Sequence, residues 1–264
     1  MITTKQLYVT CGSTEVLKGI DFVAKAGTIT AIVGPNGSGK TTFIKALSGD
    51  LPYKGIISIN GTNIAQIDTA TLATLRAVLP QSTSMYAPFL VGEVVALGLA
   101  NQAGYRCSKR TNQLSQQALE LVNLKRYAQH YYHELSGGQQ ARVQLARVLC
   151  QIWEPVVNST PRWLLLDEPV ANLDIHHQLV VMDIARNFAH RGGGVIAILH
   201  DLNLAAHYSD QLLLINQGTI QHRGAPQTVL TNENLRNVYK CCLAVGQLPK
   251  PGTPFILPQT AKHR

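Results

Sequence analysis

The stretch GPNGSGKTT occupies residues 34–42, in full Gly34-Pro35-Asn36-Gly37-Ser38-Gly39-Lys40-Thr41-Thr42. It follows the apolar run Thr30-Ala31-Ile32-Val33 and precedes the helix-like run Phe43 to Leu47. The spacing G-x-x-x-x-G-K-T predicts a loop whose backbone N–H groups wrap a triphosphate at a helix N-terminus. Lys40 is expected to reach the β- and γ-phosphates of ATP, and the Thr41 hydroxyl to bind Mg²⁺. A glycine-rich turn without a ligand is the alternative, and the strand-then-helix setting favours the nucleotide site.

The composition is that of a folded globular protein. The chain has 264 residues, of which 45% are hydrophobic and 14% charged. Its apolar runs, such as Val195 to Leu199, are far shorter than the roughly 20 residues that cross a bilayer. The first five residues are not followed by a secretory signal pattern. The formal net charge is +8, but the basic residues form no dense run in the sequence. The charge is therefore weak support for a nucleic-acid or membrane-surface partner.

The cysteines indicate a reducing compartment. Their number is odd, and no metal-ligand spacing relates the five positions, Cys11, Cys107, Cys150, Cys241 and Cys242.

Short β-rich pieces dominate the start of the chain. Residues 5–33 alternate strand-like runs with turn signals, which predicts an antiparallel hairpin leading into the first core strand. Residues 55–59 and the turn Asn60-Gly61 repeat this pattern. We therefore expect a small antiparallel sheet beside the phosphate loop.

The middle of the chain has helical spacing instead. Helices are predicted over Val91 to Ala100, Asn112 to Val122 and Gly138 to Cys150. Strand and helix signals then alternate, with buried strands at Trp163 to Leu166 and Val195 to Leu199, helices at Leu173 to His190 and Leu202 to His207, and a hairpin over 211–223. This βα alternation predicts an α/β fold with a mainly parallel sheet, helices on both faces, and the ligand at the carboxyl ends of the strands. Residues 224–264 end in a segment with Pro249, Pro251, Pro254 and Pro258, which is expected to form an irregular tail.

Two adjacent carboxylates end the first of these buried strands. Asp167 at the strand tip is expected to bind Mg²⁺, and Glu168 to polarise the water that attacks the γ-phosphorus. A solvated acidic turn is the alternative for an isolated pair. The buried strand before them and the phosphate loop elsewhere in the chain favour the catalytic interpretation.

A glycine pair opens the third predicted helix, within Leu135-Ser136-Gly137-Gly138-Gln139. Ser136 is a suitable helix cap, and the two glycines allow backbone N–H groups to approach an anion closely. Taken alone, this is an ordinary helix start. Together with the phosphate loop and the Asp167-Glu168 pair, however, this segment becomes the decisive feature of the sequence.

The ordered motifs together resemble the nucleotide-binding subunit of ABC transporters over about residues 5–235. They are Gly34 to Thr41, Gln81, Leu135 to Gln139, Leu164 to Glu168, Asn172-Leu173-Asp174 and His200. The resemblance implies a P-loop NTPase with a RecA-like core, and one ABC ATPase domain over 1–264. In that division the core and its β-subdomain span about 1–80 and 152–235, the helical subdomain about 81–151, and a C-terminal extension about 236–264.

The resemblance also implies a role for each motif residue. Two copies would face head to tail and enclose two ATP molecules, with Ser136, Gly137, Gly138 and Gln139 of one copy meeting the γ-phosphate held by Lys40 of the other. Gln81 would contact Mg²⁺ and the attacking water, His200 would hold the γ-phosphate, and Asp174 would help to join the copies. Catalysis would consist mainly of positioning and electrostatic stabilisation, with Glu168 as general base.

Two positions depart from the family pattern. Cys11 stands where many relatives place an aromatic residue that stacks on adenine, with Tyr8 nearby. Ala171-Asn172-Leu173-Asp174 replaces the common Ser-Ala-Leu-Asp. The adenine contact and the contacts between copies therefore stay open.

The stretches after Gln81 and after His200 look like those of importer ATPases for iron-siderophores, haem and vitamin B12. Arg76 to Gln81, Arg142 to Leu149 and the insert from Gln151 to Trp163 are similar to ATPases of haem (haemin) import. This resemblance implies haem uptake through two copies of a permease fed by a periplasmic or surface haem-binding protein, and a peripheral place on the cytoplasmic face of the inner membrane. An iron-siderophore or vitamin B12 importer is the alternative.

Two further interpretations are less favoured. His176-His177 is expected to be a plain surface pair, because no Cys, Met or second His cluster is spaced to complete a haem or metal site. ABC-type ATPases that act on DNA or ribosomes are a different class, but those on ribosomes usually carry two cassettes and those in DNA repair a long coiled coil. No specific nucleic-acid partner is expected.

Overall fold

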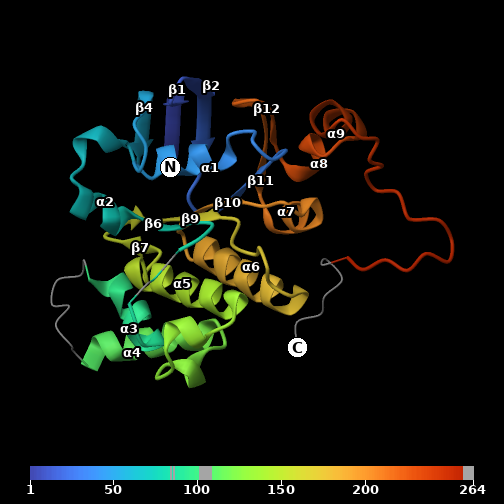
Figure 1. The fold of residues 1–264 in the computed structure, drawn as a ribbon. Helices are drawn as coiled ribbons and strands as arrows, with labels where there is room; N and C mark the ends of the chain where they lie inside the picture. Colours follow the sequence, from blue (N-terminus) through green and yellow to red (C-terminus); the bar gives the residue numbers. More distant parts are fainter. Residues whose placement is uncertain (84, 86, 101–108, 258–264) are drawn as a thin grey trace.

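The computed structural model describes residues 1–83, 85, 87–100 and 109–257. Cys107 and residues 258–264 of the expected C-terminal extension lie outside this range. Two larger β-sheets, a two-stranded hairpin and a set of helices make up the described chain (Figure 1).

The larger sheet is mainly parallel, as the βα alternation predicts. Its strand order is β12-β11-β3-β10-β9-β6, and only the β11–β12 pair is antiparallel. The strands are β3 (Ile29–Val33), β6 (Arg76–Leu79), β9 (Trp163–Asp167), β10 (Gly194–Ile198), β11 (Gln211–Asn216) and β12 (Thr219–Gly224). Every residue of β3, β9 and β10 is buried, as expected for strands covered on both faces.

The smaller sheet is antiparallel, which confirms the expectation for the start of the chain. Its order is β2-β1-β4-β5, with strands β1 (Ile2–Cys11), β2 (Thr14–Ala24), β4 (Lys54–Ile59) and β5 (Thr62–Asn63). A separate short hairpin joins β7 (Val156–Val157) to β8 (Thr160–Pro161) within the insert.

Helices connect the strands. They are α1 (Lys40–Leu47), α2 (Thr69–Leu75), α3 (Val91–Ala96), α4 (Lys109–Leu121), α5 (Gly137–Gln151), α6 (Ile175–His190), α7 (Leu202–Tyr208), α8 (Pro226–Val229) and α9 (Asn232–Tyr239). Short 3₁₀ turns lie at Ile64–Gln66, Leu97–Leu99, Lys125–Tyr127 and Tyr132–Glu134. In the described ranges, none of the helices has both the length and the apolarity needed to cross a bilayer.

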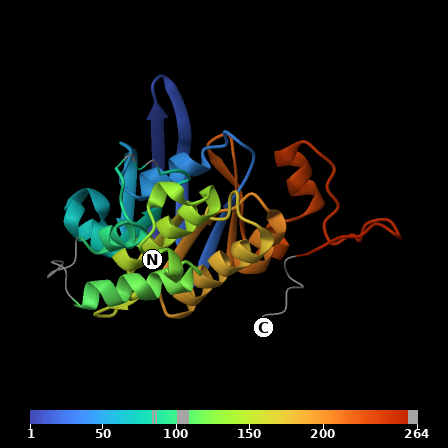
Figure 2. The same ribbon diagram turned by 60° about the horizontal axis from the view of Figure 1, so that its bottom comes forward.

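The two faces of the larger sheet pack against different layers. Because side chains alternate along a strand, Ile32, Leu165 and Ile196 meet α1 and the smaller sheet. On the other face, Leu164, Leu166 and their neighbours meet α5, α6 and α7. Figures 1 and 2 show the resulting layers, with α1 between the two sheets and the long helices below. The prediction of helices on both faces is therefore confirmed, and one of those faces is shared with the smaller sheet.

Helices α3, α4 and α5 pack together beyond β6. Gly98, just after α3, lies so close to α5 that an added Cβ would collide with the Arg147 carbonyl oxygen. The Arg142 guanidinium of α5 donates to the Val122 carbonyl at 2.8 Å, just past the end of α4. These contacts fix the start of α5, and with it the Ser136 cap, relative to the other two helices.

Two helices that the sequence analysis did not predict precede the irregular end of the chain. Residues 226–239 form α8 and α9, because Pro226 and the Thr231 cap begin helices that bury Val229, Leu235 and Val238. Helix α9 runs across residue 235, where the sequence analysis ended the core. Only from Lys240 is the chain irregular, and Figures 1 and 2 show this segment leading away from the helices.

Candidate nucleotide site

The phosphate loop connects β3 to α1, as the motif predicts. Lys40, the first residue of α1, is buried, and its Nζ donates to the carbonyl oxygens of Gly34 and Pro35, both at 2.8 Å. The Pro35 carbonyl also accepts the Ser38 N–H at 3.3 Å. Burial lowers the pKa of the Lys40 ammonium, and the nearby carboxylates of Glu168 and Asp167 work in the opposite direction. The loop therefore folds around its own lysine.

Two glycines of this loop are required by its shape. Gly34 has a φ of 152°, and a Cβ added there would collide with the carbonyl oxygen of Ile215 in β11. Gly39 has a φ of 103°, and its added Cβ would come within 2.9 Å of Leu17 Cδ2. Both positions exclude side chains for steric and conformational reasons.

Asp167 ends β9 directly beside the loop. The Thr41 hydroxyl donates to Asp167 Oδ1 at 3.2 Å. Asp167 is only 3% exposed. Burial raises the pKa of its carboxyl, and the Thr41 hydrogen bond acts in the opposite direction. Carboxylate and hydroxyl oxygens are the donors that Mg²⁺ prefers. In the described part of the chain no group of three or more His, Cys, Asp or Glu side chains is arranged to hold a metal ion. Thr41 and Asp167 would therefore supply part of a Mg²⁺ shell, and phosphate and water oxygens the rest.

Glu168 joins two other predicted site residues. Its Oε2 accepts the Gln81 Nε2–H at 2.9 Å, and its Oε1 lies 2.6 Å from His200 Nε2. Its backbone has a φ of 54°, which is uncommon for a side chain other than Gly, Asn or Asp. This turn directs the carboxylate of Glu168 toward residues from two other segments.

A cleft of about 670 Å³ brings these groups together. Residues of the phosphate loop line it together with Gln81, Glu168 and His200. The lining residues are Val16, Asn36, Gly37, Gly39, Lys40, Thr41, Thr42, Gln81, Glu168 and His200. Val16 of β2 is the member that sequence reasoning missed. Its signal was weak, since a single β-branched residue in an exposed strand has many other uses.

The aromatic candidate for adenine does not line this cleft. The Tyr8 hydroxyl donates to Gln6 Oε1 at 3.2 Å, and the ring lies against Gly19. Cys11 is exposed at the end of β1. Val16 is thus the apolar side chain of β2 that this cleft offers to a base.

The predicted signature residues do not line this cleft. Gly137 lines a neighbouring cavity of about 210 Å³, which it shares with Gln81, Asp167 and Glu168. Ser136 caps α5: its hydroxyl accepts the Gln139 N–H at 3.3 Å, and its own N–H donates to Gln139 Oε1 at 2.9 Å. Asp174 caps α6 and pairs with His177 at 2.8 Å. An added Cβ at Gly138 would come within 3.2 Å of Leu173 Cδ2, so the two segments pack against each other. His176 is exposed, as expected for a surface residue.

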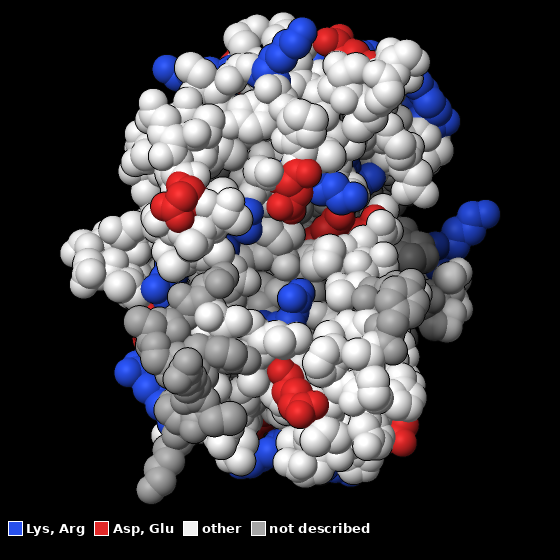
Figure 3. All heavy atoms as spheres, turned by 60° about the vertical axis from the view of Figure 1, so that its left-hand side comes forward, with Lys and Arg blue, Asp and Glu red and all other residues white. Residues whose placement is uncertain are grey.

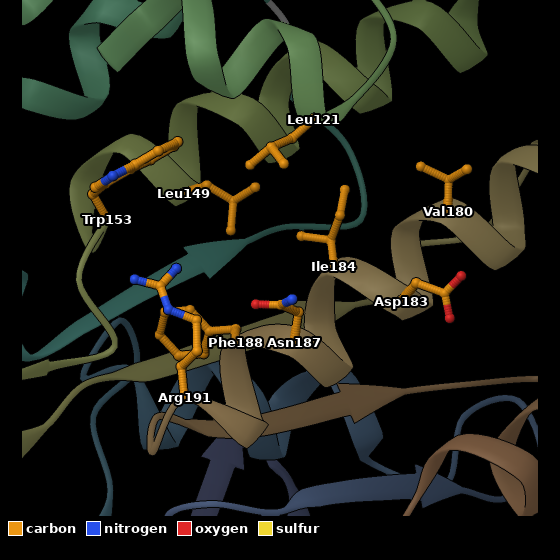
Figure 4. Close-up of a pocket in the computed structure, with 9 residues that line it drawn as sticks. All are labelled: Leu121, Leu149, Trp153, Val180, Asp183, Ile184, Asn187, Phe188 and Arg191. Carbon is orange, nitrogen blue, oxygen red and sulfur yellow. The ribbon is translucent and has the colours of Figure 1, made fainter.

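Another cavity, of about 330 Å³, lies between α4, α5 and α6 (Figure 4). Apolar side chains dominate its wall, among them Leu149, Trp153 and Phe188. Its charged groups already have partners, since Asp183 accepts from Tyr208 at 2.9 Å and Arg191 pairs with Glu154 at 3.0 Å. No residue of the predicted site lines this cavity.

Comparisons with known proteins also point to an ATP-binding protein. Residues 17–171 match the family model described as ABC transporter. The chain is 58% identical over 262 residues to the hemin import ATP-binding protein HmuV of Bartonella henselae, covering 99% of this chain and 98% of that protein. It is 49% identical over 263 residues to the protein of the same name from Mesorhizobium japonicum, covering 100% of both.

Solved structures show the same fold at lower identity. A putative metal-chelate type ABC transporter in an inward-facing conformation superposes with a TM-score of 0.74 at 24% identity, over 90% of this chain and 88% of that one. A dimeric ATP-binding cassette bound to ADP and phosphate superposes with a TM-score of 0.75 at 23% identity, over 86% of this chain and 99% of that one.

Proposed function

Because the chain belongs to the ABC transporter family, we propose that it is the ATP-binding subunit of a haem importer, which hydrolyses ATP to ADP and phosphate. The observation that carries the ATPase assignment is the single cleft that unites the phosphate loop, Gln81, Glu168 and His200. The cargo rests on relatives named for hemin import that match nearly the whole chain.

The motif residues in and beside the cleft each have a proposed task. The backbone N–H groups of the loop and Lys40 bind the phosphates of ATP, while Thr41, Asp167 and Gln81 hold Mg²⁺. When bound, Mg²⁺ neutralises charge on the phosphate oxygens. Glu168 takes the proton of the attacking water, and His200 and Gln81 keep its carboxylate oriented. His200 also holds the γ-phosphate.

A second copy of the chain supplies the missing part of the site. Ser136, Gly137, Gly138 and Gln139 lie outside the cleft of their own chain, so in this proposal they meet the nucleotide held by Lys40 of the other copy. Asp174, beside the same segment, helps to join the copies. An isolated monomer then hydrolyses ATP poorly.

The proposed assembly places the chain at a membrane without crossing it. Two copies bind two permease subunits from the cytoplasmic face of the inner membrane, and a periplasmic or surface haem-binding protein delivers cargo. We keep the proposed division into a core (about 1–80 and 152–235), a helical subdomain (about 81–151) and a C-terminal extension (about 236–264). An importer of iron-siderophores or vitamin B12 is the nearest alternative.

ATPase stimulation in liposomes tests the cargo. The chain is reconstituted with its permease subunits, and haem-loaded and siderophore-loaded binding proteins are compared, with the Lys40→Ala chain as background. Stimulation by the haem-loaded protein alone is expected. Stimulation by the siderophore-loaded protein alone would keep the ATPase assignment and overturn the cargo.

A role on nucleic acid has little support from the surface. Figure 3 shows one face of the molecule, on which Lys and Arg side chains are scattered among acidic ones. Non-specific binding to nucleic acid driven by the net charge of +8 would fall steeply with salt. Affinity purification of the tagged chain should therefore recover a membrane permease rather than ribosomes.

A further inference from the structure

The C-terminal parts of three helices enclose the apolar cavity of about 330 Å³ (Figure 4). Leu149 near the end of α5 and Phe188 near the end of α6 line it, and each is only 5% exposed. Trp153 follows α5 and adds an aromatic ring, and Figure 4 shows these three side chains around one hollow. Leu121, the last residue of α4, also lines the cavity and is 47% exposed, so a small molecule can enter from solvent.

This cavity is separate from the nucleotide cleft. Ser136 and Asp174 cap the beginnings of α5 and α6, whereas Leu149 and Phe188 lie near the ends of these helices. Helix α5 has 15 residues and α6 has 16, and at 1.5 Å per residue each is roughly 23 Å long. The cavity and the cleft have none of the described residues in common. A molecule in the cavity therefore does not occupy the place of ATP.

The charged groups at the cavity have partners within the protein. Asp183 accepts the Tyr208 hydroxyl at 2.9 Å. Arg191 Nη2 lies 3.0 Å from Glu154 Oε2. An additional charge placed against the apolar wall would lose its water without gaining a new partner. The cavity therefore favours a ligand without net charge.

The size of the cavity and one amide define the ligand further. A dry cavity of about 150 Å³ lined by Leu, Ile and Phe holds one benzene ring, so 330 Å³ has room for roughly two fused rings. Asn187 lines the cavity from α6, and Figure 4 shows its amide between Phe188 and Ile184. Because an amide both donates and accepts hydrogen bonds, Asn187 can bind one polar group of a ligand that is otherwise apolar.

We propose that this cavity is a binding site for a neutral aromatic molecule of about two fused rings that carries one hydrogen-bonding group. The rings pack against Leu149, Trp153 and Phe188, and the polar group bonds to the Asn187 amide. The proposal depends neither on the cargo nor on the ATPase assignment.

Calorimetry with three probes of equal ring size tests the class of ligand. The probes are 2-naphthol, which is neutral at pH 7, the anion 2-naphthoate and the cation 2-naphthylmethylammonium. The ligand efficiency of small molecules predicts a Kd of about 0.1 mM for 2-naphthol. The two ions should bind at least about tenfold more weakly, because each would carry a charge to the apolar wall.

Saturating MgADP separates the cavity from the nucleotide cleft, and it should leave the Kd of 2-naphthol unchanged. Displacement of 2-naphthol by MgADP would place the probe in the cleft and overturn the proposal. Equal affinity for the three probes, or no binding of 2-naphthol up to about 2 mM, would overturn it as well.

Two variants locate the probe in the cavity. Asn187→Ala, at an exposed position, removes the amide and should raise the Kd of 2-naphthol about three- to tenfold, through loss of one neutral hydrogen bond. Val180→Trp fills the cavity from a partly buried position on α6 and should abolish binding. His190→Ala is the matched control, because His190 is exposed on the same helix and does not line the cavity. A wild-type Kd in either Asn187→Ala or Val180→Trp would refute the site.

Discussion

Replacing Glu168 by glutamine should separate ATP binding from ATP hydrolysis. The glutamate side chain is 15% exposed and already meets Gln81 at 2.9 Å and His200 at 2.6 Å. Glutamine has the same shape and keeps one oxygen acceptor, so the change in folding free energy should be about 1 kcal/mol or less. The backbone φ of 54° is as accessible to glutamine as to glutamate.

The catalytic loss should be much larger than the structural one. An amide does not take up the proton of the attacking water, and loss of a general base typically costs about 10²–10⁴ in rate, or about 3–5 kcal/mol of barrier. ATP affinity should be kept, since removal of a carboxylate beside the phosphates also removes repulsion. Bound ATP that is not hydrolysed should then accumulate in a closed dimer.

Three measurements check this prediction on one preparation. They are phosphate release at saturating Mg²⁺ and ATP, titration with a fluorescent nucleotide, and the size of the ATP-bound protein by gel filtration. Glu154→Gln is the control, because Glu154 is exposed and pairs with Arg191 at 3.0 Å, away from the cleft. Hydrolysis at the wild-type rate in Glu168→Gln would refute the general-base assignment.

Three other substitutions test separate parts of the site. Lys40→Ala should weaken ATP binding about 10- to 100-fold, through loss of charge-assisted hydrogen bonds, and an unchanged calorimetric isotherm would remove the phosphate-loop assignment. Asp167→Asn should abolish Mg²⁺-dependent hydrolysis and yet raise the urea midpoint of the nucleotide-free protein at pH 7. Burial raises the pKa of Asp167, so the folded chain holds the proton of this carboxyl more tightly than the unfolded chain does. Below the ordinary pKa of 3.8 the carboxyl is protonated in both states, and the gain in stability should vanish. A gain that persists there would show that burial of the charged carboxylate is not its cause. Gly34→Ala should lower the free energy of unfolding by about 3 kcal/mol or more, because the added Cβ collides with the Ile215 carbonyl oxygen. Gly37→Ala is the control, with an expected loss of about 1 kcal/mol, since its φ is 75° but its added Cβ meets no other atom. Equal losses in the two variants would show that backbone strain alone decides the cost.

Much of the architecture could be predicted because local signals agreed with one another. The buried runs at 163–166 and 195–199 became β9 and β10, and the Gln217-Gly218 turn joined β11 to β12. In that turn both residues have positive φ, at 49° and 81°, which is the geometry that the favoured two-residue hairpins need. The motif residues came together at the carboxyl ends of the strands, as a parallel sheet requires.

The parts that sequence reasoning missed depend on tertiary contacts. Helices α8 and α9 are short, and their few apolar residues are buried only against other parts of the chain, so their local sequence shows no clear helical pattern. The positive φ of Glu168 has no local signal, because glutamate rarely adopts it.

The lysine folded into its own loop affects how the protein rests between cycles. Two backbone carbonyl oxygens accept hydrogen bonds from Lys40 Nζ, both at 2.8 Å, in place of the phosphate oxygens of a bound nucleotide. An empty site therefore leaves no buried ammonium group without acceptors, and a departing nucleotide exchanges one set of partners for another. Such an exchange lowers the cost of releasing the nucleotide, which suits a protein that must empty its site on every turnover.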